Sequence, residues 1–536
     1  MENDTYFVKY SAQLSANPLK LSNWELLLNH LIATYATPLD KTVNASTVSL
    51  ISATYKSMLV HFPYVENYHI DYALFHYRLG DIKRTRQIFL NALNTQNNRS
   101  LLLWCEYLRF LMKVEANKTI VLKNFEKAEF YIGLHFFASP FWDLYLQFIS
   151  ENGYSREIYL RVLRKIIEIP QYEFAKYYTQ WFEAIENEVR DIRDLEKFAN
   201  LQSINKKYKI NLHEIMNSNI RKGHLLQDLK LKLLSCFKEL YQAIEYQVFE
   251  VYQLFELPLT MYKNTNQCYY VPSSIPLGSK FLTNWLRYLD FTIKSHNNQL
   301  ILTVFQRCLN SANIAHLDTI WLKLADWLIQ NNSSRGQADY LGALDVLKQS
   351  QKFLRSPVAN LNLVCKISDL YLKLNYSAQS LIDLWHAHYG DPTTNPNYKI
   401  FIKYYSYMCF IKKPLSALQV QQRLKDYAEI EFLECLGDKS YMEYIIKLKL
   451  KKLLRLGKFW YLYLHIIWNK EKFSGTRSKA HNEKSKIVAS LLPQVMENLK
   501  KYNRKNQLTK LKNYRAVELW LVKYSPEHLF LFRSLC

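Results

Sequence analysis

Glycine and proline are scarce in this chain, which has 536 residues but only 11 glycines and 14 prolines. A β-rich fold with many tight turns depends on both residue types, because glycine supplies positive φ angles and proline fixes φ. Their scarcity argues against such a fold and favours helices joined by short turns. The length exceeds what one compact core can bury, so we expect two or more lobes or one elongated array.

Paired cysteines and long apolar runs are also missing. None of the eight cysteines forms a C-x-x-C pair, and several fall inside helical patterns, as small buried side chains in a reducing compartment do. The longest apolar run, 459–468, includes His465 and is too short to span a membrane. No basic-then-apolar signal opens the sequence. We therefore expect an intracellular protein without membrane contact.

Motifs that carry chemistry are absent too. The sequence contains no G-x-x-x-x-G-K-[ST], G-x-G-x-x-G, G-x-S-x-G or H-E-x-x-H. His213-Glu214 lacks the second histidine of a zinc motif, and His386 and His388 point in different directions on a helix. We therefore predict no catalytic residue, no cofactor-binding residue and no metal ligand, and hence no enzyme.

A Trp-x-x-Tyr pair recurs at an almost fixed distance. Trp104 and Tyr107 are followed 38 residues later by Trp142 and Tyr145. Further on, Trp285 and Tyr288 are followed 36 residues later by a single tryptophan, Trp321. A period of this length, carried by aromatic residues three apart, is typical of stacked helix pairs.

A second pattern lies between these pairs and marks the other helix of each unit. The segments 86–93 and 156–163 share Arg-x-Ile-aromatic-x-x-small-Leu, and weaker copies occur at 125–128 and 304–309. Apolar stripes at helical spacing are normally buried packing, so we assign the aromatic residues to the repeat core and not to a base-stacking surface. The predicted core residues are Trp24, Tyr68, Phe89, Trp104, Tyr107, Phe125, Trp142, Tyr145, Tyr159, Trp285, Tyr288, Phe305 and Trp321.

The predicted fold is therefore all-α, an α-solenoid of helix-pair repeats in two arrays joined by a long helix. Residues 1–190 form the N-terminal array, in which Trp24 and Tyr68 occupy places equivalent to Trp104. Residues 191–280 form a linker, with a long helix at 225–256 and a boundary loop after it. Residues 281–536 form a less regular C-terminal array with a basic final part.

Positive charge accumulates near the C-terminus. The formal net charge is +23, and the residues from Tyr441 onward contain 21 Lys and Arg against 6 Asp and Glu. Such a concentration attracts phosphate backbones or acidic protein segments, but it also suits a solvated face. No motif for reading bases accompanies it, so any RNA contact would be with the backbone. The candidate contact residues are Lys447, Lys449, Lys451, Lys452, Arg455, Lys458, Lys500, Lys501, Arg504 and Lys505.

The alternation of a Trp-x-x-Tyr helix with an Arg-x-Ile-Phe helix resembles the half-a-TPR (HAT) repeat of RNA-processing proteins. The segments 62–73, 99–104, 131–146 and 163–170 are similar to the yeast-type pre-mRNA-processing factors thirty-nine and forty-two, and closer to factor forty-two. The similarity is specific from about residue 55 to 185. Beyond residue 280 the repeat character persists with little motif identity.

This resemblance implies a nuclear, non-catalytic scaffold of the U1 small nuclear ribonucleoprotein (U1 snRNP), the particle that selects the 5′ splice site. Members of the family bridge core and auxiliary subunits, contact core proteins through the N-terminal array, and dimerise with a paralogous or identical HAT protein through the C-terminal array. Two other functions stay open from the residues alone. One is a scaffold for 3′-end cleavage or ribosomal RNA maturation, and the other is direct RNA binding through the basic segment.

Overall fold

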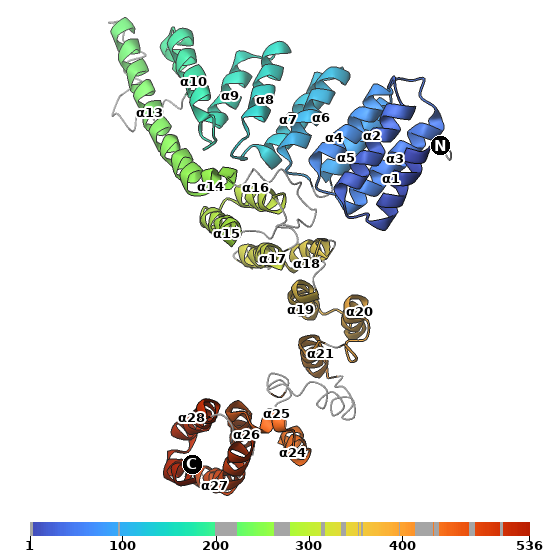
Figure 1. Cartoon of the computed structure of the whole chain (residues 1–536). Coiled ribbons are helices and arrows are strands. Elements are labelled where there is room, and N and C mark those ends of the chain that lie inside the picture. Colours follow the sequence, from blue (N-terminus) through green and yellow to red (C-terminus); the bar gives the residue numbers. More distant parts are fainter. Residues whose placement is uncertain are drawn as a thin grey trace. The chain divides into compact units, whose positions relative to one another are not determined.

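The structure is a computed structural model, and it is helical throughout the residues that it describes, with no strand among them (Figure 1). Those residues are 4–94, 97–198, 222–261, 279–311, 317–333, 339–351, 353–354, 357–395, 397–412, 433, 439–470, 477–503 and 507–535. The prediction of an all-α fold built from helix pairs is confirmed.

The N-terminal helices pack in sequence order. Each of the helices α2 to α9 contacts the next, and α6 also packs on α4 and α8, so the helix pairs stack on one another (Figure 1). The helices are α1 (Thr5–Ala16), α2 (Leu21–Tyr35), α3 (Ala45–His61), α4 (Glu66–Arg78), α5 (Ile82–Asn94), α6 (Leu101–Val114), α7 (Lys118–Ile132), α8 (Ser139–Glu151), α9 (Arg156–Ile167) and α10 (Phe174–Glu188).

Helix starts are set by short polar side chains. Ser100 Oγ accepts a hydrogen bond from Leu103 N at the start of α6, and Asn117 Oδ1 accepts one from Thr119 N at the start of α7. These bonds satisfy amides that have no partner inside the helix. Pro140 lies in the first turn of α8, where its missing N–H costs nothing.

In several first helices of the repeats, the fourth residue is buried and also bonds the turn that precedes the helix. Trp24, Trp104 and Trp142 occupy it in α2, α6 and α8, and their rings are buried. Each indole N–H also donates to a carbonyl in the turn before the helix: Trp24 to Pro18 O at 2.8 Å, Trp104 to Asn98 O at 2.7 Å and Trp142 to Gly133 O at 3.2 Å. The same side chain therefore fills the core and fixes the turn that joins two helix pairs.

Gly133 illustrates how closely this turn is packed. A Cβ atom at this position would lie 3.2 Å from the Trp142 ring and 2.5 Å from Glu129 O. The carbonyl that accepts the Trp142 bond belongs to the same residue. Only glycine fits between the indole and the end of α7.

Two of the predicted core aromatics lie at the edge of the core. Tyr68 is half-buried, and its hydroxyl donates to Glu25. The fourth residue of α4 is instead His69, which bonds Pro63 O at 2.9 Å, six residues back, as Trp24 and Trp104 do. Tyr159 is also half-buried, because its hydroxyl meets Gln180 and the Arg156 guanidinium covers its ring at 4.3 Å. The other eleven predicted core aromatics are buried.

A long helix follows the first array. α13 (Lys222–Val251) continues through a π-helical turn at Tyr252–Glu256 into α14 (Leu257–Met261). It packs on α10, with Phe237 against Trp181. The short η1 (Ile192–Lys197) precedes it. Residues 199–221 of the predicted linker lie outside the described residues, as does most of the predicted boundary loop at 263–280.

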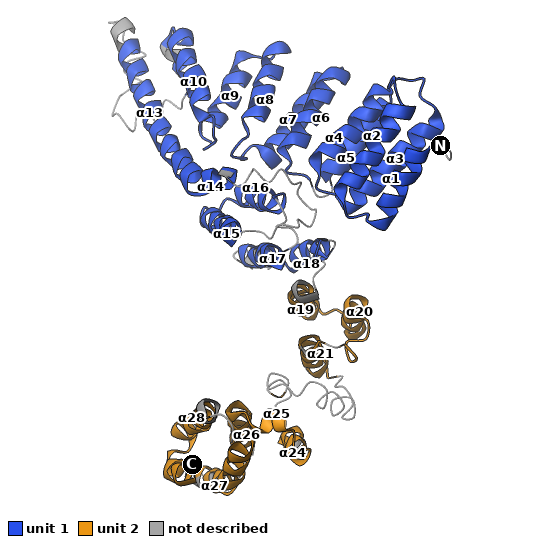
Figure 2. Ribbon diagram, viewed as in Figure 1, with its two compact units in different colours: residues 1–356 blue, residues 357–536 orange. Residues whose placement is uncertain are grey.

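The two compact units of the structure are not the same segments as the two predicted repeat arrays. Residues 1–356 form one compact unit and 357–536 a second (Figure 2), whereas we expected the C-terminal array to begin at 281. The helices α15 (Ser279–Lys294), α16 (Asn298–Leu309), α17 (Asp318–Ser333) and α18 (Tyr340–Ser350) belong to the first unit. The physical reason is a set of buried polar contacts between α16 and the N-terminal array, described below.

The second unit contains two apolar clusters. One joins α19 (Pro357–Lys373), α20 (Ala378–Tyr389) and α21 (Tyr398–Phe410) around Trp385. The other centres on Trp460 and Trp520 in the last helices. Those helices are α24 (Lys439–Lys447), α25 (Lys451–Leu454), α26 (Gly457–Lys470), α27 (Arg477–Tyr502), α28 (Gln507–Tyr524), the short η4 (Pro526–His528) and α29 (Leu529–Leu535). Trp460 is again the fourth residue of its helix and donates to Leu454 O at 2.9 Å.

We predict that Trp104→Phe destabilises its repeat by about 1–3 kcal/mol, because it removes the bond to Asn98 O and part of a buried ring. Trp104→Ala should cost roughly 3–5 kcal/mol. Hydrogen exchange of the amides in α6 and α7 measures both losses. Leu102→Ala, on the exposed side of α6, is the control and should change the opening free energy by less than about 1 kcal/mol. Equal effects of Trp104→Phe and Leu102→Ala would contradict a role for the indole bond.

Candidate interaction surfaces

No group of three His, Cys, Asp or Glu side chains suited to a metal ion occurs among the described residues. Within the same residues, no helix is long and apolar enough to cross a bilayer. A serine, a histidine and a carboxylate do meet in the second unit. Ser485 Oγ lies 2.7 Å from His528 Nε2, but Glu527 accepts a hydrogen bond from Ser485 and not from the imidazole. A carboxylate that does not orient the histidine leaves this cluster without the geometry of a catalytic triad, and it serves to tie α27 to η4.

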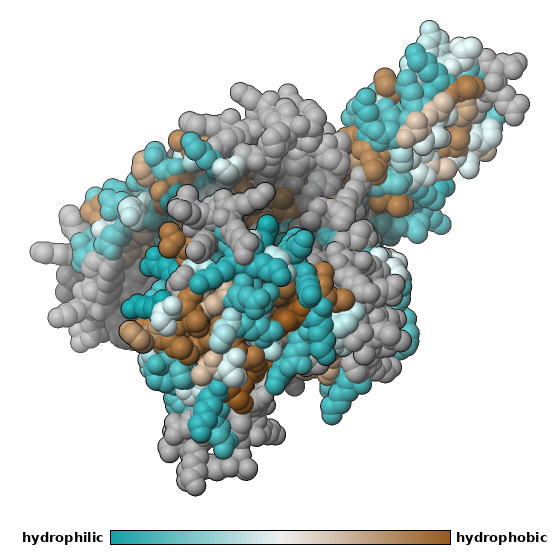
Figure 3. All heavy atoms as spheres, turned by 60° about the horizontal axis from the view of Figure 1, so that its bottom comes forward, coloured by the Kyte–Doolittle hydropathy of each residue, from teal (hydrophilic) through white to brown (hydrophobic). Residues whose placement is uncertain are grey.

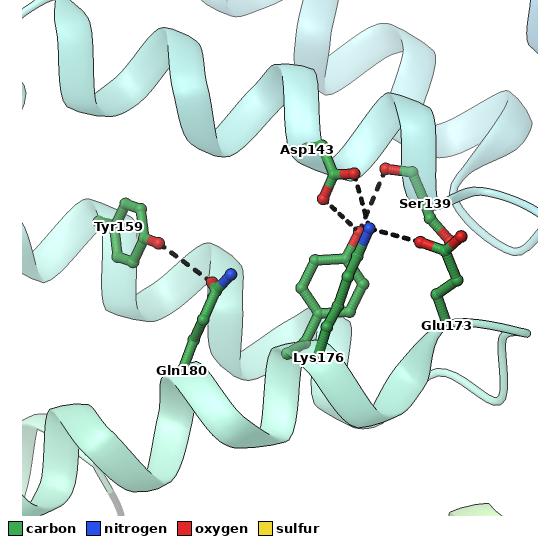
Figure 4. Close-up of polar contacts among 7 residues, drawn as sticks. Ser139, Asp143, Tyr159, Glu173, Lys176 and Gln180 are labelled. Carbon is green, nitrogen blue, oxygen red and sulfur yellow. Dashed lines mark hydrogen bonds and ion pairs between the residues drawn. The ribbon is translucent and has the colours of Figure 1, made fainter.

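In the first unit, many surface cations are already paired with carboxylates of neighbouring repeats. Lys176 Nζ, on α10, lies 2.7 Å from Asp143 Oδ2 of α8 and 2.6 Å from Glu173 Oε2 (Figure 4). Tyr177 OH donates to Asp143 Oδ1 and to Ser139 O, so α8 and α10 are braced side by side. Arg86–Glu115 and Arg156–Glu188 connect other helices in the same way. Exposed pairs of this kind add little stability, but they set the angle between repeats.

A buried arginine connects the N-terminal array to α16. Arg99, in the turn before α6, donates to Gln299 Oε1 at 2.6 Å, to Thr303 Oγ1 at 3.0 Å and to Tyr131 O at 3.2 Å. It pairs with no carboxylate among the described residues, and burial lowers its pKa to about 10. Neutral acceptors on α16 therefore satisfy a charge that belongs to the first array.

Two further polar contacts lie along the same interface. Glu66, at the start of α4, accepts a bond from Asn310 Nδ2 at 3.1 Å, and burial raises the pKa of its carboxyl. Arg307 forms a bidentate ion pair with Glu256, at 2.7 and 2.9 Å, and its guanidinium covers the ring of Phe137 at 5.4 Å. These contacts explain why α15 to α18 group with the first unit.

Sequence reasoning missed this interface, because no local pattern distinguishes Arg99 or Arg307 from solvated arginines. Their partners lie 200 and 51 residues away along the chain. The only local signal is weak: Arg99 and Asn98 stand in the turn before Trp104, where the repeat places residues that face a neighbour. Contacts between residues this far apart in the sequence can be recognised only in the folded structure.

The structure brings the two predicted basic clusters of the second unit together. Asn503 Nδ2 donates to Arg455 O at 2.8 Å and Asn513 Nδ2 donates to Asn503 Oδ1 at 3.2 Å. Asn513 Oδ1 also accepts from Gly457 N at 3.1 Å. The turn before α26 is thereby held against the end of α27 and the start of α28.

We call the resulting set of exposed cations the basic surface. The side chains of all its members are exposed. Arg504 and Lys505, the remaining candidates, lie outside the described residues. The basic surface consists of Lys447, Lys449, Lys451, Lys452, Arg455, Lys458, Lys500 and Lys501.

Close to the C-terminus, an apolar face is exposed on α28 and α29. Leu511, Leu519 and Val522 share one side of α28, because they are separated by eight and three residues. Phe530 on α29 is 84% exposed, and the Arg533–Glu518 ion pair at 2.7 Å joins the two helices next to it. Figure 3 brings the lower end of Figure 1 forward and shows brown hydrophobic areas interrupting the hydrophilic surface. We call these four side chains the α28–α29 face.

Stacked helix pairs, several of which have a tryptophan or histidine in the fourth position of the first helix that bonds the preceding turn, define a HAT-type α-solenoid. Family models described as the PRP39 N-terminal HAT repeat and the PRP39 C-terminal HAT repeat match residues 8–183 and 262–364. The U1 small nuclear ribonucleoprotein component PRP42 of Saccharomyces cerevisiae is 33% identical over 92% of both chains. The chain belongs to the PRP39/PRP42 family of HAT-repeat proteins.

More distant relatives carry the name pre-mRNA-processing factor 39. The protein of Schizosaccharomyces pombe is 20% identical, over 64% of this chain and 54% of its own length. The human protein is 22% identical, over 62% of this chain and 48% of its own. The chain thus spans about half the length of these factor 39 proteins.

We predict that Glu256→Gln destabilises the α15–α16 region by about 3–5 kcal/mol, because it leaves the buried Arg307 charge without its partner. Thermal unfolding and hydrogen exchange of α16 measure the loss. The double change Glu256→Leu with Arg307→Met removes both charges and should recover most of it. Lys323→Ala, which breaks the exposed pair with Asp290, is the control and should cost less than about 1 kcal/mol.

Proposed function

We propose that this protein is a non-catalytic scaffold subunit of the U1 snRNP. It acts in the nucleus, in pre-mRNA splicing and 5′ splice-site recognition, by bridging core and auxiliary subunits of the particle. The observation that carries the proposal is the similarity to PRP42, a protein named as a U1 snRNP component. This similarity covers 92% of both chains. Similarity over the whole length favours the same role more strongly than a match confined to one repeat array.

The physical character of the molecule supports a scaffold. Stacked helix pairs present long surfaces to several partners at once, and their rigidity comes from repeat-to-repeat contacts such as those of Trp104 and Tyr177. The side-chain chemistry described above contains braces and buried ties and no assembled triad or metal cluster among the described residues. Such a structure positions other subunits and does not transform a substrate.

Purifying the tagged full-length protein from the cells that produce it, followed by sequencing of the bound RNA, tests the proposal. We expect U1 RNA and U1 core proteins in the same fraction. Recovery with the RNA of another processing complex, such as a ribosomal RNA precursor or 3′-end cleavage factors, would instead assign the chain to that assembly.

We further propose that the α28–α29 face binds a paralogous HAT-repeat chain. Its apolar side chains have no cover within the described residues, and exposed contiguous apolar surface of this kind marks protein interfaces. The choice of occupant is supported by the resemblance to the family, which implies dimerisation with a paralogous or identical chain through the C-terminal array.

The double change Leu519→Asp with Phe530→Asp should abolish the association with the second HAT chain, because it places two charges in an apolar contact. Mass photometry of the purified complex measures the loss. Both side chains are more than half exposed, so the unit itself should stay folded. Leu341→Asp, an equally exposed position in the first unit, is the control and should leave the dimer intact. Unchanged dimerisation of the double variant would contradict this interface.

A second proposal concerns the basic surface, which we assign to the phosphate backbone of RNA. The supporting observation is that two segments rich in exposed lysine and arginine converge at the Asn503–Asn513 contact. Backbone binding depends on salt, because each contact releases condensed counterions.

Changing Lys447, Lys449, Lys451 and Lys452 together to Ala should lower the affinity for a labelled single-stranded RNA and flatten its salt dependence. Each lost contact should reduce the slope of log K against log salt by about 0.7. Fluorescence anisotropy at several salt concentrations measures both. The same variant should keep its association with U1 core proteins. An unchanged slope would leave the basic surface as a solvated face.

A further inference from the structure

A cavity of about 760 Å³ opens between α3, α4 and α5 in the first unit. Three cations line it: Lys56 on α3, and Lys83 and Arg84 in the first turn of α5. Its floor includes Tyr72 of α4, whose hydroxyl is buried and has no hydrogen-bond partner among the described residues.

These cations differ from those that brace the neighbouring repeats. Lys56, Lys83 and Arg84 form no ion pair with any carboxylate in the described part of the chain. One carboxylate lies among them, Asp81, but its Oδ1 accepts a hydrogen bond from Arg84 N and caps α5. The positive charge of the cavity is therefore only partly compensated, and the N-terminal end of α5 adds to it.

The buried His76 senses the same charge from beneath. Burial, together with the nearby charges of Arg84 and Lys56, lowers the pKa of His76 to about 4, while Asp81 opposes them. Both cations thus act on one interior point, although they come from different helices. A concave site with a field of one sign favours an anionic group.

The remaining lining residues indicate what carries that anion. Gln87 and Asn91 are four residues apart on the exposed side of α5, where their amides can pair with the N–H and C=O groups of an extended chain. Leu59, Val60 and Ile88 supply an aliphatic wall, and Val60 is 76% exposed. From Arg84 to Asn91 the helix rises about 10 Å, the length of roughly three extended residues.

We propose that this cavity binds an extended acidic peptide segment of a partner protein. Carboxylates of the segment meet Lys56, Lys83 and Arg84, its backbone pairs with Gln87 and Asn91, and one aliphatic side chain packs on Leu59 and Val60. Single-stranded RNA fits less well, because its bases bind by stacking on exposed aromatic rings, and the two rings in this lining are buried (Tyr72) and half-buried (His69). The site is independent of the role proposed for the C-terminal helices.

The full-length protein can be tested with a fluorescein-labelled peptide of three Glu-Leu-Asp-Glu repeats. Two matched peptides separate the contributions: Gln-Leu-Asn-Gln repeats remove the charge, and Glu-Ser-Asp-Glu repeats remove the aliphatic side chain. We expect the first peptide to bind most tightly in fluorescence anisotropy. The double variant Lys83→Glu with Arg84→Glu should weaken it about tenfold or more.

Lys123→Glu with Lys127→Glu is the control for charge alone. These two lysines of α7 are exposed and form no ion pair among the described residues. Like the α5 variant, the control replaces two cations with two carboxylates, so the net charge of the protein changes by the same amount. It should alter the affinity less than about twofold. Lys56→Glu, on the opposite wall, should weaken binding of the peptide as well. This variant replaces the α5 variant if hydrogen exchange shows that the α5 variant is misfolded.

Three results would overturn the proposal. Equal weakening by the α5 and α7 variants would mean general charge attraction. Equal affinity of the charged and neutral peptides would mean that the cations play no part. Tight binding of a labelled oligouridine that is lost on changing Lys83 and Arg84 would assign the cavity to nucleic acid.

Discussion

The structure depends on one contact that recurs along the chain: in α2, α4, α6, α8 and α26 the side chain at the fourth position of the helix bonds a carbonyl of the preceding turn. Trp24, Trp104 and Trp460 make this bond six residues back, and His69 makes it where the tryptophan is replaced. A ring that only filled space would leave the turn free to vary. Because a hydrogen bond is directional, the ring also restrains the orientation of a helix pair relative to the preceding pair. The outer surface of the stacked pairs depends on that orientation.

How far the sequence could predict this structure depends on the range of the interactions concerned. Periodic aromatics, helix-capping residues and scarce glycine predicted the helix-pair fold, since all of these act within one or two repeats. At α4 the sequence pattern did not indicate which residue bonds the preceding turn, because Tyr68 and His69 are adjacent and both are half-buried. The compact units could not be predicted, because the Arg99–Gln299 contact within the first unit joins residues 200 positions apart in the sequence.

The candidate surfaces follow the same rule. Composition located the basic residues near the C-terminus, but the Asn503–Asn513 contact that unites them involves uncharged residues with no sequence signature. The cavity beside α5 was missed altogether, because its cations stand one or two at a time in separate helices. Lys56, Lys83 and Arg84 are distinguished by having no carboxylate partner in the described part of the chain, whereas Arg86, Arg156 and Lys176 of the same unit have one.

The polar character of the α16 interface matters during synthesis. Arg99 leaves the ribosome about 200 residues before Gln299. The N-terminal repeats can therefore fold before α16 is synthesised. Had the surface that later contacts α16 been apolar, it would have been open to aggregation throughout this interval. Arg99 and Glu66 instead keep it hydrated, and a neutral strip of α16 later displaces the water. The buried charge that costs stability in the finished protein thus protects the unfinished one.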